Sequence, residues 1–404
     1  MARYKQLSQK RILDDLLKQG IFKDTSLSFT DISVQSDTLI TRVEDELGHS
    51  VIITQILSNT LNSASTTEDN VQHIALNALQ ERQQSCPDYT ADLLYLDQEH
   101  AFYVMQDLKH FTPLSTRLIR GDNIKTLSGL LAQYLAQSLF YTSDLYVLSD
   151  IKRAKQTIFS HPAGSQLTQQ SHFEHPYNPD DNPNKHDFIR PLMKDEQLDP
   201  SLLAEIAELN LKFINTSQAL LHGKLTPDAI LLDNEELKVT TSTLSSYGPI
   251  GFDVGTLLGQ LLINFCTSAL RFDKYTRADH LDALIDLIRA TWNQFADYFS
   301  ELMQKETQNP CLMNETFQAR YLRSIFLDSV GFAGCELIAQ SYWAATNEPT
   351  ANTRPHDIHC LKNDTEQSTA IADCMALGKV LINKRYQFVS INDVLLEAEA
   401  IIEH

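Results

Sequence analysis

The sequence predicts an α+β protein in two parts, a small β-rich N-terminal lobe followed by a large, mainly helical C-terminal lobe. β-branched runs at residues 38–43 and 50–57 flank a polar turn, which is typical of a β-hairpin. From about residue 124 onward, apolar side chains recur three and four positions apart, which is typical of helices. A single short hairpin pattern, within residues 230–240, interrupts the helical part. These observations predict two lobes that differ in secondary structure.

The N-terminal elements begin with a short helix. Residues 5–19 carry Leu7, Ile12 and Leu16 at helical spacing, which favours an amphipathic helix ahead of the hairpin. The hairpin is followed by a polar segment, 58–70, without clear periodicity. The remaining elements predicted for this lobe are a helix over 71–84 and a strand over 101–105.

The C-terminal lobe begins with a predicted helix over 124–143. Residues 155–190 are polar and rich in Pro, Asn, Asp and His, which indicates a loop or an excursion from the fold. Asp199 followed by Pro200 is typical of a helix start, because Asp caps the first turn and Pro needs no N–H donor there. The other predicted elements are a loop over 221–226, hairpin strands at 230–232 and 237–240, a long helix over 281–302, and further helices from 316 with a polar break at 347–364.

The composition excludes several classes of protein. The 404 residues carry 33 Lys and Arg against 52 Asp and Glu, and this net charge of −19 argues against binding to nucleic acids. No apolar run is long enough to span a membrane, and the polar N-terminus has no signal-peptide core. The six cysteines form no CxxC pair, which is typical of reduced thiols. We therefore expect a cytoplasmic protein with neither nucleic acid nor membrane as a partner.

Glycine is scarce in this chain. It occurs 13 times, about 3% of the residues, where about 7% is usual. Because glycine lets a backbone approach phosphate groups closely, the shortage argues against a glycine-rich nucleotide-binding loop.

Several pieces of the sequence match one family pattern. Residues 222–229 read HGKLTPDA, and residues 241–253 read TSTLSSYGPIGFD. These pieces resemble the methylthioribose kinase family, in which the corresponding patterns are HGDLHTGS and DPEFAFYGPxGFD. Further pieces similar to the family lie at residues 104–108, 139–145 and 329–336, so that the resemblance covers roughly residues 25–395.

The resemblance implies a bilobal protein-kinase-like fold. Its N-lobe, an antiparallel sheet plus helices, would cover residues 1–107, and its helical C-lobe would cover residues 108–404. Residues 222–229 would then be a vestigial catalytic loop, and residues 241–253 a vestigial metal-binding loop. Kinase chemistry depends on positioning the reactants and on neutralising phosphate charge. The side chains on these two loops therefore decide whether the chemistry is still possible.

The positions that the resemblance assigns to catalysis hold other residues here. Lys224 stands where the family has its catalytic aspartate, and an ammonium group neither accepts a proton nor attracts magnesium. Thr241 and Thr243 stand where the family has its magnesium carboxylates, and a hydroxyl is a weak substitute for a carboxylate. Ala229, at the other metal position of the catalytic loop, cannot bind a metal. We expect no intact catalytic residue and no metal site.

The nucleotide positions implied by the resemblance are altered as well. Thr54 stands where the family has its phosphate-binding lysine, and Asn77 stands near the position of the carboxylate that orients that lysine. Ser33 and Gln35 replace two glycines of the loop that covers the phosphates. The vestigial nucleotide cleft implied by the family would be lined by Ser33, Gln35, Thr54, Gln106 and Leu108.

The substrate position implied by the resemblance also differs. Ala339 and Gln340 replace a pair of arginines with which the family holds the sugar oxygens. Neither side chain carries the positive charge of that clamp. The sugar-binding function therefore changes together with the nucleotide-binding function.

We therefore expect a methylthioribose-kinase-like pseudokinase that lacks phosphotransfer and acts as a scaffold, a regulator or a binder of a small anion near Lys224. No cofactor is expected, and the family implies a homodimer or a heterodimer with an active relative. The alternative is an active kinase of methylthioribose or another small alcohol, which would need ATP and Mg²⁺ and serve methionine salvage. A third hypothesis is a changed phosphotransfer or nucleotidyl transfer that uses Lys224 or nearby acids.

Acidic residues near the catalytic loop have a simpler interpretation. Asp228 and Asp233 are typical of turns or caps, although either is a candidate displaced acid. The glycines and Asp253 of the motif at residues 247–253 are expected to hold the loop and the helix that follows it.

Two histidine pairs have a spacing similar to that of metal ligands. His172 and His175 lie three residues apart, as do His356 and His359. Neither pair has a second pair at the spacing of a zinc site, so we expect no metal binding.

Overall fold

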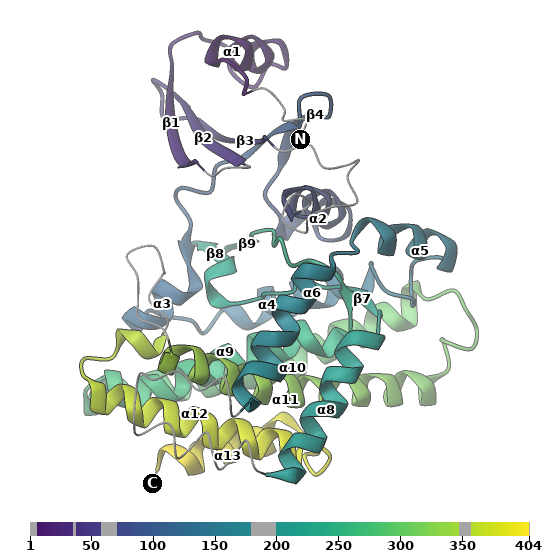
Figure 1. Cartoon of the computed structure of the whole chain (residues 1–404), viewed down its shortest axis with the longest axis vertical. Coiled ribbons are helices and arrows are strands. Elements are labelled where there is room, and N and C mark those ends of the chain that lie inside the picture. Colours follow the sequence, from purple (N-terminus) through teal and green to yellow (C-terminus); the bar gives the residue numbers. More distant parts are fainter. Residues whose placement is uncertain (1–5, 35–37, 58–70, 179–198, 347–356, 404) are drawn as a thin grey trace.

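The computed structural model describes residues 6–34, 38–57, 71–178, 199–346 and 357–403. It has the two lobes that the sequence predicts (Figure 1). A small sheet with helix α1 beside it stands above a large helical lobe, and helix α2 lies between the two.

The N-lobe is built on a five-stranded antiparallel sheet with strand order β1-β2-β3-β5-β4. In this sheet β3 lies at the centre, with Thr54 opposite Ile40 of β2 and Tyr103 of β5. The elements are α1 (Gln9–Lys18), β1 (Leu27–Val34), β2 (Thr38–Asp45), β3 (Ser50–Ile56), α2 (Val71–Ser85), the 3₁₀ turn η1 (Pro87–Tyr89), β4 (Leu93–Asp97) and β5 (Phe102–Gln106).

Each face of the sheet is covered by one helix, because successive side chains of a strand point to opposite faces. Val51 and Ile53 of β3 pack against Leu16 of α1 on one face. Ile56 of the same strand and Tyr103 of β5 pack against α2 on the other face. The sheet is therefore buried between α1 and α2.

The C-lobe is mainly helical, with short strands around the predicted catalytic loop. Its small sheets pair β6 with β8, β8 with β9, and β7 with β10. Up to residue 248 its elements are β6 (Thr112–Pro113), α3 (Leu114–Arg120), α4 (Leu127–Phe140), α5 (Ser149–Ile158), α6 (Pro162–Gln169), the π-helical turn η2 (Gln170–Glu174), η3 (His175–Tyr177), α8 (Pro200–Asn215), β7 (Ala219–Leu220), η4 (Pro227–Ala229), β8 (Ile230–Asp233), β9 (Glu236–Val239) and β10 (Tyr247–Gly248). The later elements are α9 (Ile250–Arg271), α10 (Lys274–Glu306), α11 (Glu315–Thr346), η5 (Asp357–Cys360), α12 (Asp364–Lys384) and α13 (Ile391–Ile402).

Helices α9 and α11 run parallel at very short range along a stripe of glycines. A Cβ atom built on Gly251 would lie 2.5 Å from the Cβ of Asp328, and one built on Gly255 would lie 2.6 Å from the carbonyl oxygen of Ser329. Gly259 faces Glu336 in the same way, at 2.8 Å. These glycines are required because any side chain would push the two helices apart.

Helix α9 is the centre of the C-lobe core. Among the described residues it is the one helix long and apolar enough to cross a membrane, and its apolar stretch is fully buried within the protein. That burial identifies α9 as a core helix. Its N-terminal end contains part of the motif at residues 247–253, which we expected to hold the catalytic loop.

The structure confirms the predicted elements that have a clear period. The hairpin pairs β2 with β3, and Asp199 caps α8 by accepting hydrogen bonds from the N–H groups of Ser201 and Leu202. The predicted helices over 71–84, 124–143 and 281–302 correspond to α2, α4 and α10, and the second hairpin corresponds to β8 and β9.

The predicted loop over 155–190 is wrong where the structure describes it. Residues 155–178 contain the end of α5, then α6, η2 and η3, while the remaining residues of that range lie outside the described part. The side chain of His161 begins α6 by accepting a hydrogen bond from the N–H of Gly164, and Phe173 is buried in the C-lobe core. A histidine cap and the buried rings of Phe159, Phe173 and Tyr177 fix a segment whose composition is polar.

Candidate functional site

The predicted catalytic loop is held from behind by a buried carboxylate. Asp253, on the first turn of α9, is 2% exposed. Its carboxylate accepts hydrogen bonds from the N–H groups of His222, at 2.6 Å, and Gly223, at 3.0 Å. Burial raises the pKa of Asp253, although these two hydrogen bonds and the charge of Arg82 act to lower it. The expectation that Asp253 holds the loop is confirmed.

His222 braces the same loop with both of its ring nitrogens. Its Nε2 lies 2.9 Å from the carbonyl oxygen of Thr240, and its Nδ1 accepts a hydrogen bond from the N–H of Lys224 at 3.3 Å. One neutral tautomer satisfies both contacts, with the proton on Nε2. Burial lowers the pKa of His222 to about 4, so the ring is a neutral brace at physiological pH.

The predicted metal-binding loop lies directly beside the catalytic loop. The N–H of Thr240 donates to the carbonyl oxygen of Ala229 at 2.9 Å, and the hydroxyl of Ser245 donates to the carbonyl oxygen of His222 at 3.3 Å. Gly223 makes this approach possible, because its φ of +78° suits glycine and a Cβ there would lie 2.3 Å from the carbonyl oxygen of Leu244. The structure therefore brings the two loops together as the resemblance implies.

The side chains presented by these two loops carry no carboxylate at the family's reactive positions. Lys224 is exposed. Thr241 and Thr243 are half-buried and Ala229 is buried. The site therefore offers one cation and two hydroxyl groups, which suits an anion better than a magnesium ion.

The nearby acids are engaged as turn and loop residues. Asp228, in η4, accepts a hydrogen bond from the hydroxyl of Ser115 in α3. Asp233 lies at the turn of the β8–β9 hairpin and accepts a hydrogen bond from the side chain of Asn234 at 3.1 Å. The contact of Asp233 fits the turn role that we expected, whereas that of Asp228 links η4 to α3.

The predicted position of the phosphate-binding lysine in the N-lobe is closed to solvent. Thr54 is 4% exposed on β3, where it lies opposite Tyr103 of β5. Asn77 lies half-buried on α2, so the structure provides neither a lysine on this strand nor a carboxylate at that helix position. A buried threonine at this place cannot reach a phosphate as a long cationic side chain would.

The other nucleotide positions lie at the edge of the N-lobe. Ser33 lies at the end of β1, opposite Ile40, and Gln35 is outside the described residues. The N–H of Gln106 donates to the carbonyl oxygen of Asp92 at 2.9 Å, and the carbonyl oxygen of Leu108 accepts from the N–H of Phe111 at 3.0 Å. Gln106, at the end of β5, and Leu108 therefore belong to the connection between the lobes.

The predicted substrate positions face the core of the C-lobe. Ala339 is buried, and the amide of Gln340 donates to the Oε1 atom of Glu336 at 2.9 Å. The same buried carboxylate accepts from Gln260 of α9 at 2.6 Å and from the Nε2 atom of His172 at 2.7 Å. Burial acts to raise the pKa of Glu336, but the hydrogen bonds to these partners lower it overall.

Sequence reasoning missed the cluster of His172, Gln260 and Glu336. Glu336 belongs to a piece that resembles the family, and this was the available signal that it has a buried role. His172 lies in the segment that we predicted as a loop, so nothing in the sequence placed it beside α11. The structure thus joins three segments that are far apart in the chain.

No metal centre is found in the residues that the structure describes. Among them, no group of three or more His, Cys, Asp and Glu side chains is arranged to hold a metal ion. His172 is bound to Glu336, His359 packs against the ring of Trp343, and His356 lies outside the described residues.

Comparison with known proteins finds relatives over most of the chain. A methylthioribose kinase of Yersinia enterocolitica serotype O:8 / biotype 1B is 30% identical over 313 residues, which cover 77% of this chain and 76% of that protein. A methylthioribose kinase of Yersinia pestis, strain Pestoides F, is 32% identical and the match covers 74% of this chain and 72% of the relative. A methylthioribose kinase of Cronobacter sakazakii is 29% identical, with coverage of 74% and 73%.

Solved structures with a similar arrangement include small-molecule kinases. A choline kinase from Cryptosporidium parvum aligns with a TM-score of 0.46 at 12% identity, covering 98% of this chain and 97% of its own. A glucosamine kinase aligns with a TM-score of 0.48 at 10% identity, covering 83% and 84%. A scan against models of protein families finds no match.

Proposed function

Since the chain belongs to the methylthioribose kinase family, we propose that it is a member without phosphotransfer that binds a small anion beside Lys224 and acts as a scaffold or a regulator. One observation carries this proposal. Lys224 presents an exposed ammonium group on a loop whose backbone is held by Asp253 and His222. The frame of a catalytic loop is present, and its reactive position has the opposite charge.

The reversed charge changes which ligands the loop can hold. A carboxylate at the position of Lys224 could accept a proton and help to hold Mg²⁺, whereas an ammonium group repels the metal and attracts anions. Thr241 and Thr243, on the neighbouring loop, have half-buried hydroxyl groups that can donate hydrogen bonds. A phosphate-sized anion fits this chemistry, and magnesium-bound ATP does not.

The proposal is tested by titrating the protein with inorganic phosphate in a calorimeter. The wild type is expected to bind, and Lys224→Ala to bind at least about tenfold more weakly, because a hydrogen bond to a charged group contributes about 1.5–3 kcal/mol. Lys274→Ala is the matched control, since this exposed lysine begins α10 near the opposite end of α9. Equal binding by the wild type and Lys224→Ala would contradict an anion site at this lysine.

A second candidate function is an active ATP-dependent kinase of methylthioribose or another small alcohol. The names of the relatives favour it, and the comparisons by themselves support this candidate better than the first. It would need ATP and Mg²⁺, with altered catalytic residues such as Asp228 on η4. A thermal shift distinguishes the two candidates, since ATP with Mg²⁺ should raise the melting temperature of an active kinase and leave that of the anion binder unchanged.

We further propose a cytoplasmic protein that forms a homodimer or pairs with an active relative, in a role connected with methionine salvage. The family resemblance supports this part of the proposal. The proposed dimer is checked by sedimentation of the protein alone and of the protein mixed with an active relative. A monomer under both conditions would contradict it.

A further inference from the structure

Three polar side chains outside the two loops of the candidate site form a chain of short contacts. The hydroxyl oxygen of Ser171 lies 2.8 Å from the Nδ1 atom of His172. The Nε2 atom of the same ring lies 2.7 Å from the Oε2 atom of Glu336 on α11. A nucleophile, a base and a group that orients the base, each within about 2.6–3.2 Å of the next, are the arrangement of an activated nucleophile.

Burial increases along this chain from the serine to the glutamate. Ser171 is exposed on the π-helical turn η2, the side chain of His172 is 15% exposed, and that of Glu336 is 2% exposed. Attack on a substrate needs an accessible hydroxyl, whereas a buried carboxylate keeps the base in place. The reactive end of the chain therefore faces solvent, and its supporting end faces the core.

Glu336 is held so that one of its oxygen atoms is left for the histidine. The side-chain amides of Gln260 and Gln340 donate to Oε1 at 2.6 and 2.9 Å, and Oε2 accepts from His172. The ring of His172 also packs against the ring of Phe252 on α9, with the centroids 5.6 Å apart. These contacts fix both the carboxylate and the plane of the imidazole.

The arrangement selects one tautomer of the neutral imidazole of His172. Because Nε2 faces a carboxylate, it carries the proton, and Nδ1 is left to accept one from the hydroxyl of Ser171. The carbonyl oxygen of Thr168 lies 3.1 Å from Nδ1 and 3.1 Å from the hydroxyl oxygen of Ser171, so the hydroxyl can rotate between this oxygen and the ring. Once Nδ1 has taken a proton, it can donate to the same carbonyl oxygen, and the protonated ring has an acceptor on each side.

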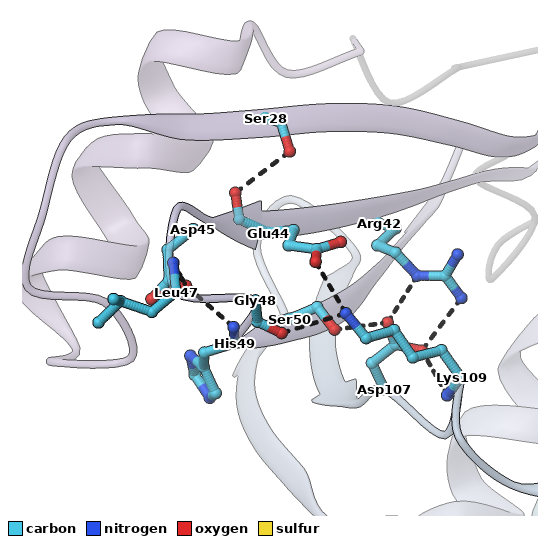
Figure 2. Close-up of polar contacts among 10 residues, drawn as sticks. All are labelled: Ser28, Arg42, Glu44, Asp45, Leu47, Gly48, His49, Ser50, Asp107 and Lys109. Atoms are coloured by element: carbon cyan, nitrogen blue, oxygen red, sulfur yellow. Dashed lines mark hydrogen bonds and ion pairs between the residues drawn. The ribbon is translucent and has the colours of Figure 1, made fainter.

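A serine in the N-lobe also contacts a buried carboxylate, but without an imidazole between them. The hydroxyl of Ser50 donates to Asp107 at 2.8 Å, and Arg42 donates to the same carboxylate at 2.6 Å (Figure 2). Burial acts to raise the pKa of Asp107, but its hydrogen bonds to Arg42 and Ser50 lower it overall, so this carboxylate is a poor base. Ser50 is therefore a matched serine that should not be activated.

We propose that Ser171 is a nucleophile that takes the acyl group of an activated ester, with His172 as the base and Glu336 as the residue that positions this base. The hydroxyl oxygen of Ser171 forms a bond to the carbonyl carbon of the ester while its proton moves to Nδ1 of His172. The bond from that carbon to the leaving alcohol then breaks, and the alcohol takes the proton from Nδ1. Water attacks the acyl-serine in the same way, which releases the acid and restores the serine.

The class of ester follows from what these residues supply. A positioned general base contributes about 10²–10⁴-fold to the rate. This contribution suits esters of an acidic alcohol, such as nitrophenyl esters, because their leaving group departs without further help. The inference uses none of the residues of the anion site, so a failure here leaves phosphate binding at Lys224 to be judged by its own titration.

The nucleophile is tested on the full chain with a fluorophosphonate probe, which binds an activated serine covalently with loss of fluoride. Peptide mapping by mass spectrometry is expected to find the adduct on Ser171. Ser171→Ala should abolish this labelling, and the matched variant Ser50→Ala should leave its rate unchanged. A wild-type protein without an adduct on Ser171 would overturn the proposal.

The base is tested by the rate of p-nitrophenyl acetate hydrolysis. His172→Gln should lower the rate at least about a hundredfold. A rate in His172→Gln equal to that of the wild type would overturn the role of the base. The side chain of His172 is partly exposed, and circular dichroism checks that the variant is folded.

The positioning role of Glu336 is tested by the pH profile of the same reaction. In Glu336→Gln, the pH of half-maximal rate should move to lower values, because a carboxylate beside an imidazole favours its protonated form. A residue that only stabilises the fold would leave this profile in place. An unchanged profile in folded Glu336→Gln would therefore contradict the positioning role, and if this buried variant does not fold, His172→Gln still decides the proposal.

Discussion

The two sides of the catalytic loop differ in how closely their residues match the family pattern. On the buried side, Asp253 and His222 satisfy the loop's backbone through contacts of 2.6–3.3 Å, and the glycines of α9 let α11 pack behind it. On the exposed side, Lys224 and the half-buried Thr241 and Thr243 stand where the resemblance places the family's carboxylates. The buried side matches the family pattern, and the exposed side departs from it.

This difference separates two kinds of constraint. The buried groups are needed for folding, because an unpaired polar group or an extra methyl group there has a large cost in stability. The groups on the other side contribute to binding or chemistry and not to the core, so they can change with little effect on the fold. Substitutions on the two sides should therefore separate into large and small effects on stability.

The largest effect is expected from Asp253→Ala. The variant leaves two buried N–H donors, of His222 and Gly223, without an acceptor. Each unsatisfied donor costs about 1–3 kcal/mol, so the free energy of unfolding should fall by roughly 2–6 kcal/mol. Denaturant unfolding followed by circular dichroism measures this. Asp253→Asn is the milder control, because its amide oxygen can still accept one of the two bonds, and a loss as large as that of alanine would show that the charge matters more than the count of bonds.

Gly255→Ala should come next. Its new Cβ would lie 2.6 Å from the carbonyl oxygen of Ser329, and overpacking of this kind costs typically about 1–3 kcal/mol. Gly129→Ala in α4 is the matched control, since its Cβ would meet the flexible end of Gln294 at 3.3 Å. That control should be neutral or stabilising by up to about 1 kcal/mol, as alanine favours helices more than glycine does. Equal losses in both variants would contradict the close packing of α9 and α11.

Asp373, on α12, tests the cost of a half-buried charge away from the loop. Burial raises its pKa to about 6. Its contribution to stability is therefore present below the unfolded pKa of about 4 and is lost as the pH rises through about 6. Asp373→Asn should gain about 1–2 kcal/mol at pH 8, allowing for solvent screening, and nothing near pH 4. Thermal unfolding at both pH values measures this gain in stability. The control is Asp364→Asn, at an exposed position of the same helix, which should show no gain at pH 8.

The smallest effect on stability is expected from Lys224→Ala. The side chain is exposed, and substitutions of this kind usually change stability by less than about 0.5 kcal/mol. The same variant should lose phosphate binding, as proposed above. A loss of stability comparable to that of Asp253→Ala would show that Lys224 has a structural role and would remove the contrast between the two sides.

Much of the fold could be predicted because periodic patterns reflect burial directly. The hairpin of β2 and β3 and the caps of α8 follow from local sequence chemistry. Strands β1 and β4 were missed, and each contains a shift in register, between Asp31 and Ser33 and between Leu93 and Tyr95. A bulge interrupts the alternation of side chains from which a strand is recognised.

The loops that carry the candidate site residues could be predicted from the sequence, but the contacts around them could not. The resemblance placed Lys224, Ala229, Thr241 and Thr243 on neighbouring loops, and the structure has these loops side by side. The partners of Glu336 could not be predicted, because His172 comes from a segment more than a hundred residues away, whose polar composition is typical of a loop. Contacts between distant segments produce no periodic pattern of residues in the sequence.

The measurement that tests the central claim most directly is the transfer of radiolabelled phosphate from ATP to methylthioribose in the presence of Mg²⁺, run at high protein concentration beside an active relative. We expect no label in the sugar above a blank without protein, because Lys224 and Thr241 replace the groups that would take the proton and hold the metal. Labelled methylthioribose that increases in proportion to the amount of this protein would contradict the claim and establish the chain as a kinase.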